Sequence, residues 1–230
     1  MKAWSASLVC AGMSPRKSRA RNLPDDSAPN SPPLIGLTGS IGAGKTEVAR
    51  ILASLGCFVV HSDDLAREAL RDPSIKPQIV AEWGAAILDP ATGDIDRSLL
   101  AHIVFSDSEQ RRTLESITHP WIEARRNELF ASAPPTTRAF VIDAPLLIEA
   151  GVDDQCDAVI FVDADRSLRL ARLRATRGWD EAELARREAS QVPLDQKRKR
   201  ADDVIINEGD LAGLRDQVRS VLSRILHRTA

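Results

Sequence analysis

Five short, unbroken apolar runs recur along most of the chain, separated by longer mixed segments. They are residues 34–38, 57–60, 139–142, 158–162 and 204–206. Runs of this kind, without alternation of apolar and polar residues, are typical of strands that are buried on both faces of a parallel sheet. The pattern therefore predicts an α/β fold: a three-layer sandwich with about five parallel strands.

Helical spacing appears between the apolar runs. After the first run, apolar residues recur at i, i+3, i+4 and i+7 from Val48 to Leu55, and Gly56 stands where a C-terminal cap would be. The same spacing predicts a closing amphipathic helix over residues 211–226.

A long segment separates the second and third runs. Its roughly 75 residues are too many for one crossover helix, and helical spacing in residues 99–104 and 114–122 predicts a helical insertion over about residues 64–130. His119-Pro120 is expected to break the second of these helices, because proline favours the first turn of a new helix. His119 is either a capping or packing residue or a substrate-binding one.

Residues 1–33 differ in composition from the main domain, which is expected over residues 34–227. Five of the chain's 13 prolines lie in this first segment, among polar residues and without hydrophobic periodicity. We therefore expect a disordered tail. Basic residues between Arg16 and Arg21 leave a targeting peptide as the alternative, and Met13 is an alternative start.

Composition narrows the class of protein further. The chain has 230 residues, 43% of them hydrophobic, and a net charge of −2, which gives no global reason to bind nucleic acid or an anionic membrane. No apolar run approaches the ~18 residues of a membrane span. Three cysteines without metal-ligand spacing indicate a reducing compartment. We expect a cytoplasmic monomer or small homo-oligomer that binds neither nucleic acid nor membranes.

The stretch Gly39–Thr46 matches the phosphate-loop pattern G-x-x-x-x-G-K-[ST], between the first apolar run and the first helix. Glycines let consecutive backbone N–H groups surround a polyphosphate, and the helix N-terminus adds partial positive charge. Lys45 is expected to reach the β/γ-phosphates, and the Thr46 hydroxyl to bind Mg²⁺. A glycine-rich connecting turn is the alternative. The expected nucleotide-binding residues are Gly42, Ala43, Gly44, Lys45, Thr46 and Glu47.

Aspartates follow two of the apolar runs. Asp63 and Asp64 come after the second run, and Asp143 ends the third. Right-handed crossovers bring the carboxyl ends of parallel strands to one edge of the sheet, so these carboxylates are expected beside the phosphate loop. Asp143 is a candidate Mg²⁺ carboxylate. Helix capping or a turn is the alternative role for each aspartate.

Residues 166–200 are strongly basic, with 11 of the chain's 31 Lys and Arg residues against five acids. One interpretation is a solvated helical face with i,i+4 ion pairs, such as Glu183 with Arg187. The other is a lid whose arginines close over a transferring phosphoryl group. The run Lys197–Arg200 lacks the interleaved aromatic residues of a nucleic-acid patch and leads directly into an apolar run. We favour the lid.

From about Leu34 to Ile225 the sequence resembles the dephospho-CoA kinases, a family of P-loop kinases. The two most specific motifs are Pro-Leu-Leu-x-Glu and Ala-Asp-x-x-Ile-x-Asn. The shared residues are Gly36–Thr46, Ser62-Asp63, Ala66-Arg67, Asp96-Arg97, Phe105, His119-Pro120, Pro145–Glu149, Arg172, Arg177, Arg187, Gln191 and Ala201–Asn207.

The resemblance implies a P-loop NTPase fold and phosphorylation by ATP of the ribose 3′-hydroxyl of dephospho-CoA, the last step of coenzyme A synthesis. It also implies a CoA-binding helical insertion and a lid over about residues 166–200. Asp63 would orient or deprotonate the acceptor hydroxyl. The other implied residues are Lys45, Arg172 and Arg177 in catalysis, Asn207 at ATP, and Arg67, His119 and Glu149 at the substrate.

The chain departs from the family at one point. The family usually has Asp-x-Asp after the second strand, and here His61 occupies the first position while Asp63 keeps the second. The family also often lacks an acid at the position of Asp143, so we hypothesise that Asp143 shares the metal binding.

Other classes of function fit less well. Another P-loop small-molecule or nucleotide kinase stays open, because the phosphate loop does not identify the acceptor. A GTPase would need an Asn-Lys-x-Asp motif, which the sequence lacks. A nucleic-acid-binding ATPase is disfavoured by the net charge of −2.

Overall fold

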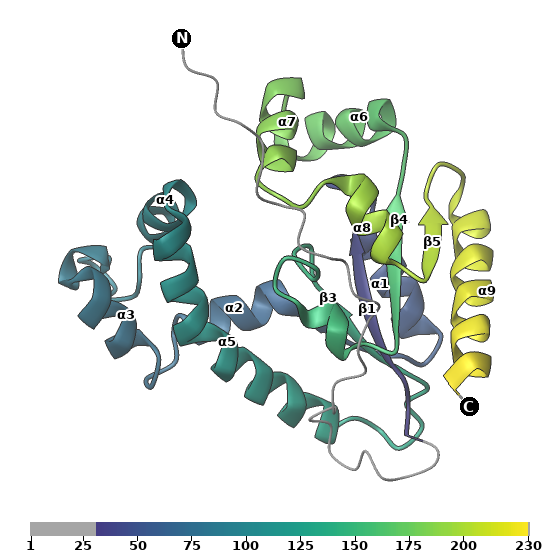
Figure 1. Cartoon of the computed structure of the whole chain (residues 1–230), viewed down its shortest axis with the longest axis horizontal. Helices are drawn as coiled ribbons and strands as arrows, with labels where there is room; N and C mark the ends of the chain where they lie inside the picture. Colours follow the sequence, from purple (N-terminus) through teal and green to yellow (C-terminus); the bar gives the residue numbers. More distant parts are fainter. Residues whose placement is uncertain (1–30, 230) are drawn as a thin grey trace.

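The computed structural model describes residues 31–229, without the side chains of residues 105, 106 and 108, so the tail expected over residues 1–33 lies almost wholly outside the described residues. Within them, five strands form one sheet in the order β2-β3-β1-β4-β5 (Figure 1). All four pairings are parallel, which confirms the predicted five-stranded α/β fold. The strands are β1 (Leu34–Gly39), β2 (Phe58–His61), β3 (Phe140–Asp143), β4 (Ala158–Asp163) and β5 (Asp203–Ile206).

Helices cover both faces of the sheet (Figure 1). Helices α1 (Lys45–Ser54) and α9 (Leu211–Thr229) pack on one face, against residues such as Ile35. The neighbouring residue Leu34 belongs to the opposite core, which includes Phe130. Both sides of β1 are therefore buried, which explains its unbroken apolar run.

The insertion between β2 and β3 consists of helices with a core of their own. This core includes Ile79, Ile87 and Leu100. The sequence pattern did not predict α2 and α3, because an eight-residue helix spans only two turns and gives a weak periodic signal. The elements are α2 (Ser62–Ala69), α3 (Lys76–Trp83), the 3-10 turn η1 (Ala85–Ile87), α4 (Arg97–Ser106) and α5 (Ser108–Ala131).

The expected helix break at His119-Pro120 is wrong. Helix α5 continues through both residues, with Pro120 in its interior. Proline removes the hydrogen bond to the carbonyl of Ser116, four residues earlier. Ser116, His119 and Pro120 are all exposed, so water reaches that carbonyl, and packing at both ends of the long helix offsets the loss.

Three helices make up the basic segment that we call the lid, residues 166–200. They are α6 (Arg166–Arg177), α7 (Glu181–Ala189) and α8 (Leu194–Arg200). Figure 1 shows α6 and α7 beyond the carboxyl ends of the strands, while α8 returns toward β5. The predicted ion pair between Glu183 and Arg187 is confirmed at 2.7 Å.

The basic run in α8 is not a free cationic patch, because each of its four side chains contacts a carboxylate. The pairs are Lys197 with Glu149 at 2.7 Å, Arg198 with Asp163 at 3.2 Å, Lys199 with Asp195 at 3.6 Å and Arg200 with Asp153 at 2.5 Å. Three of the four partners lie outside the lid, so these pairs anchor α8 to the body of the protein.

Lys197 is the most buried of these basic residues, with 0% of its side chain exposed. Its ammonium group contacts Oε1 of Glu149 at 2.7 Å and donates to the Pro145 carbonyl at 3.1 Å and to Oε1 of Gln191 at 2.9 Å. Three acceptors match the three donors of the group, which is what makes burial of the charge tolerable. Lys197 therefore fixes the base of the lid to the loop that follows β3.

We predict that Lys197→Ala lowers the free energy of unfolding by about 3 kcal/mol, because the Glu149 carboxylate loses its charged partner and the Pro145 and Gln191 oxygens lose a buried donor. Lys199→Ala is the matched control on the same helix, where the side chain is 68% exposed, and a change within about 0.5 kcal/mol is expected. Urea denaturation followed by circular dichroism measures both. Equal effects in the two variants would contradict the anchoring role.

Candidate active site

The phosphate loop lies at the carboxyl end of β1 and leads into α1. Gly42 and Gly44 have φ values of 81° and 88°, in the left-handed region that favours glycine. A Cβ atom at Gly44 would also lie 2.3 Å from Nδ2 of Asn207. Helix α1 begins directly at Lys45, so its N-terminal N–H groups open onto the loop, as a site for a polyphosphate requires.

The carbonyl groups of the loop are held by side chains from far along the chain. The Ala43 carbonyl accepts from Nδ2 of Asn207 at 2.8 Å and from Nη1 of Arg172 at 3.3 Å. The Ile41 carbonyl accepts from Nη1 of Arg169 at 3.1 Å. In a trans peptide the C=O and the following N–H point in opposite directions. These contacts therefore direct the N–H groups of Gly42 and Gly44 away from the lid side chains.

Asp143, at the end of β3, is buried with 5% of its surface exposed. One carboxylate oxygen contacts the Lys45 ammonium, and the other forms a hydrogen bond of 2.8 Å with Nδ1 of His61. The parallel register pairs His61 with Asp143 directly across the sheet. The sequence placed Asp143 at this edge, but it gave no sign that His61 would be its partner.

Asp63 lies in the first turn of α2, where its residue is exposed to solvent. Its neighbour Asp64 forms an ion pair of 2.9 Å with Arg67. Because β3 lies between β1 and β2, the phosphate loop and the end of β2 are about 9–10 Å apart in the sheet direction. Asp63 therefore lies at the same edge of the sheet as the phosphate loop, two strands away from it on the side of β2.

The expected substrate residues have different surroundings. Arg67 lies on α2, which packs against α5, and His119 is exposed on α5 itself. Glu149 instead faces the base of the lid, where its Oε1 contacts Lys197 and accepts from the Val192 N–H at 3.0 Å. The contacts in the structure thus give Glu149 an anchoring role.

The two arginines expected in catalysis also differ. Arg172 is half-buried beside the phosphate loop and donates to the Asn207 carbonyl at 2.9 Å. Arg177 is exposed at the end of α6, and its guanidinium lies 5.0 Å from the ring centre of Trp179. Arg187 stacks on the same ring at 4.2 Å. Arg172 is in place at the loop, whereas Arg177 must leave Trp179 to reach a phosphate.

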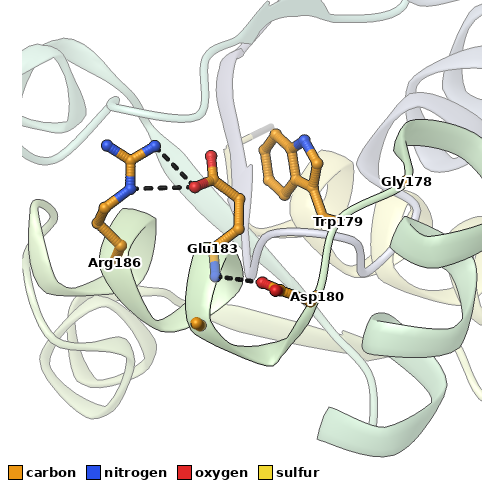
Figure 2. A pocket seen from close by; sticks show the side chains of 6 residues that line it. Gly178, Trp179, Asp180, Glu183 and Arg186 are labelled. Carbon is orange, nitrogen blue, oxygen red and sulfur yellow. Dashed lines mark hydrogen bonds and ion pairs between the residues drawn. The ribbon is translucent and has the colours of Figure 1, made fainter.

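The lid also carries an open pocket of about 390 Å³ between the end of α6 and α7. Figure 2 shows the Trp179 ring opposite Glu183, whose carboxylate holds Arg186 at 2.7 Å and whose N–H donates to Asp180. The lining residues are Gly178, Trp179, Asp180, Ala182, Glu183 and Arg186. All six belong to the lid, and none of them is a residue of the phosphate loop.

Both described cysteines are buried, and neither forms a disulfide with another described residue; they are Cys57 and Cys156. Burial raises the pKa of the Cys57 thiol to about 11, so the thiolate form is rare near neutral pH. Among the described residues, no helix is both long and apolar enough to span a membrane.

A parallel sheet, a glycine phosphate loop after its central strand and an arginine-bearing lid together define a P-loop kinase. Comparison with known proteins identifies the particular kind. Residues 33–213 match the family model described as "Dephospho-CoA kinase". The chain therefore belongs to the dephospho-CoA kinase family, which confirms the resemblance seen in the sequence.

Curated relatives share most of the chain. The dephospho-CoA kinase of Syntrophotalea carbinolica is 43% identical over 195 residues, which cover 84% of this chain and 92% of the relative. The dephospho-CoA kinase of Corynebacterium efficiens is 41% identical over 84% of this chain and 98% of its own length.

Solved structures agree with these relatives. A crystal structure from Thermus thermophilus is 33% identical, with a TM-score of 0.75, over 84% of this chain and 97% of that one. The dephospho-CoA kinase from Campylobacter jejuni is 27% identical, with a TM-score of 0.53, over 84% of this chain and 96% of that one.

Proposed function

We propose that this chain transfers the γ-phosphoryl group of ATP to the ribose 3′-hydroxyl of dephospho-CoA, giving coenzyme A and ADP. The observation that carries the proposal is the family match over residues 33–213, which spans the phosphate loop, the insertion and the lid. The small-molecule acceptor enters from the side of the insertion, and ATP lies on residues 42–47. The geometry of the phosphate loop and its neighbouring carboxylates supports this assignment.

On the nucleotide side, the N–H groups of the loop and the first turn of α1 bind the β- and γ-phosphates. Lys45 exchanges its contact with Asp143 for the phosphate oxygens. Arg172 lies beside the loop, and it would offset negative charge on the transferring phosphoryl group by exchanging its contacts with the Ala43 and Asn207 carbonyls for phosphate oxygens. Asn207 acts through the Ala43 carbonyl, which it holds at 2.8 Å.

A magnesium ion fits the residues present. Mg²⁺ takes oxygen ligands and relies on one or two protein groups, with substrate phosphates and water completing its coordination. The Thr46 hydroxyl at the start of α1 and the buried Asp143 carboxylate are the groups that would hold it. When bound, the ion would neutralise charge on the phosphate oxygens.

On the acceptor side, Asp63 accepts the proton of the ribose hydroxyl, since its exposed carboxylate lies at the same sheet edge as the loop. Arg67 and His119 remain proposed substrate contacts on the insertion. For Glu149 the contacts with Lys197 and Val192 support the anchoring role instead.

We further propose that the protein works as a monomer or small homo-oligomer in the cytoplasm, without nucleic-acid or membrane partners. The buried Cys57 and Cys156, which form no disulfide among the described residues, support a reducing compartment.

An acceptor panel tests the function directly. The protein is incubated with ATP and Mg²⁺ together with dephospho-CoA, nucleoside monophosphates or small sugars, and products are identified by mass spectrometry. We expect 3′-phosphorylation of dephospho-CoA with a kcat/KM far above that of any other acceptor. Efficient phosphorylation of another acceptor, with dephospho-CoA inert, would establish the alternative of a different P-loop small-molecule or nucleotide kinase.

The two lid arginines provide a second prediction. Arg172→Ala and Arg177→Ala should each lower kcat by about 10²-fold or more, as loss of a transition-state contact does. Arg174→Ala, at an exposed position on the same helix, is the control and should change kcat little. Steady-state kinetics at saturating ATP measures kcat for the three variants. A normal kcat in Arg177→Ala would restrict Arg177 to its stacking contact with Trp179.

The third prediction concerns the proposed base. Asp63→Asn keeps the size of the side chain and removes its charge, so kcat should fall by about 10²–10⁴-fold while ATP affinity stays within a few-fold. Asp64→Asn is the control, because Asp64 forms an ion pair with Arg67 on the same helix turn. Steady-state assays and calorimetric ATP titration give both quantities. Near-normal turnover in Asp63→Asn would remove Asp63 from its role as the base.

A further inference from the structure

Arg169 is a buried arginine in the lid that the sequence analysis did not select. Only 4% of the residue is exposed, and it lies on the face of α6 that packs toward the phosphate loop, one turn before the buried Leu173. Its Nε donates to the Ala164 carbonyl at 3.1 Å, and its Nη1 donates to the Ile41 carbonyl at 3.1 Å. The guanidinium thus contacts the backbone of the phosphate loop itself.

The charge of Arg169 is balanced from the second lid helix. Oε1 of Glu188, on α7, accepts from Nη1 of Arg169 at 2.7 Å, and Oε2 accepts from Arg166 at 2.5 Å. Burial raises the pKa of the Glu188 carboxyl, but hydrogen bonds from Arg169 and Arg166 more than offset that effect, so the pKa lies below its ordinary value. Glu188 therefore stays ionised and holds both arginines.

These contacts form a continuous connection from α7 to the phosphate loop: from Glu188 to Arg169, and from Arg169 to the Ile41 carbonyl. In the trans peptide that follows Ile41, the direction of this carbonyl sets the direction of the Gly42 N–H. That N–H belongs to the group of donors that the loop offers to phosphate. A small rotation of this peptide changes the hydrogen bonds that ATP receives.

We propose that Arg169 is a positioning residue for ATP, and that Glu188 holds Arg169 in the geometry that keeps the Gly42 N–H directed at the phosphate. The order of the α7 helix and the affinity for ATP are then coupled through one ion pair. The proposal rests on the proposed function only in taking ATP as the ligand, and it is independent of the acceptor.

Without Glu188, Arg169 loses a charged partner at 2.7 Å, and its guanidinium is free to turn toward other acceptors or solvent. The Ile41 carbonyl then loses its fixed donor. A purely structural role would lower stability without changing the affinity of the folded protein for ATP. A positioning role therefore predicts a changed Kd for ATP, whereas a purely structural role predicts a changed Tm alone.

The test uses the full chain with Glu188→Gln, Arg169→Gln and the double variant. The control is Glu181→Gln, which removes the other carboxylate that Arg166 contacts, at 2.7 Å, and leaves the pair of Arg169 and Glu188 intact. Calorimetric titration with Mg·ATP gives the Kd, and thermal unfolding without nucleotide gives Tm. We expect Glu188→Gln and Arg169→Gln each to raise the Kd on the order of tenfold. The double variant should add little beyond either, because both changes break one connection.

The expected control result is a Kd within about twofold of wild type in Glu181→Gln. In steady-state assays over a range of ATP concentrations, the positioning role also predicts a larger change in KM for ATP than in kcat, because the contact acts on bound ground-state ATP. If Arg169→Gln does not fold, Glu188→Gln alone decides. A lowered Tm with an unchanged Kd in Glu188→Gln would overturn the proposal.

Failure of the proposed function gives a different result. Wild-type protein that binds ATP but does not phosphorylate dephospho-CoA would reject the acceptor assignment. The Kd values of the variants would still support or overturn the role of Arg169.

Discussion

The conformation of the phosphate loop is the constraint on which the rest of the structure depends. A loop that turns its N–H groups toward a ligand must turn its carbonyls the other way, and buried carbonyls need donors. Here Arg169 and Arg172 from α6, and Asn207 after β5, supply those donors. These residues follow the loop by more than 120 positions. The loop is therefore completed only when the lid and the last strand have docked.

Apolar runs and helical spacing predicted the strands and helices whose buried residues are continuous or periodic in the sequence. The five strands contain unbroken apolar runs because both sheet faces are covered, and α1 follows from its apolar spacing and its phosphate loop. The insertion was less predictable. Helices α2 and α3 are short, and Pro120 indicated a break that α5 does not have, since tertiary packing overrides the local cost of proline.

Side-chain contacts between residues on different strands could not be predicted, for a different reason. The sequence indicated that Asp63 and Asp143 share an edge with the phosphate loop, but strand order decides which side chains meet, and apolar runs carry no information on order. Lys197 shows the same limit. It looked like one member of a solvated basic run, whereas its partner Glu149 lies in the loop after β3. Such pairs arise from the docking of distant segments.

Strand order also explains the histidine at position 61. Because β3 lies between β1 and β2, Asp143 stands between the strand that leads into the phosphate loop and the strand that ends at His61, in direct register with position 61. An aspartate there, as the family usually has, would place a second carboxylate beside a buried one, and like charges at that distance disfavour ionisation of both. His61 instead binds Asp143 at 2.8 Å.

The acid at position 143 and the histidine at position 61 are thus physically consistent with each other. One carboxylate oxygen of Asp143 contacts Lys45, at the start of α1, and the other contacts His61, at the end of β2. A chain with Asp at both positions would set two carboxylates side by side, whereas here Lys45 and His61 contact the two oxygens of Asp143. His61 is engaged with Asp143, whereas Asp63, in the first turn of α2, stays exposed to solvent, which supports the role proposed for Asp63 toward the acceptor hydroxyl.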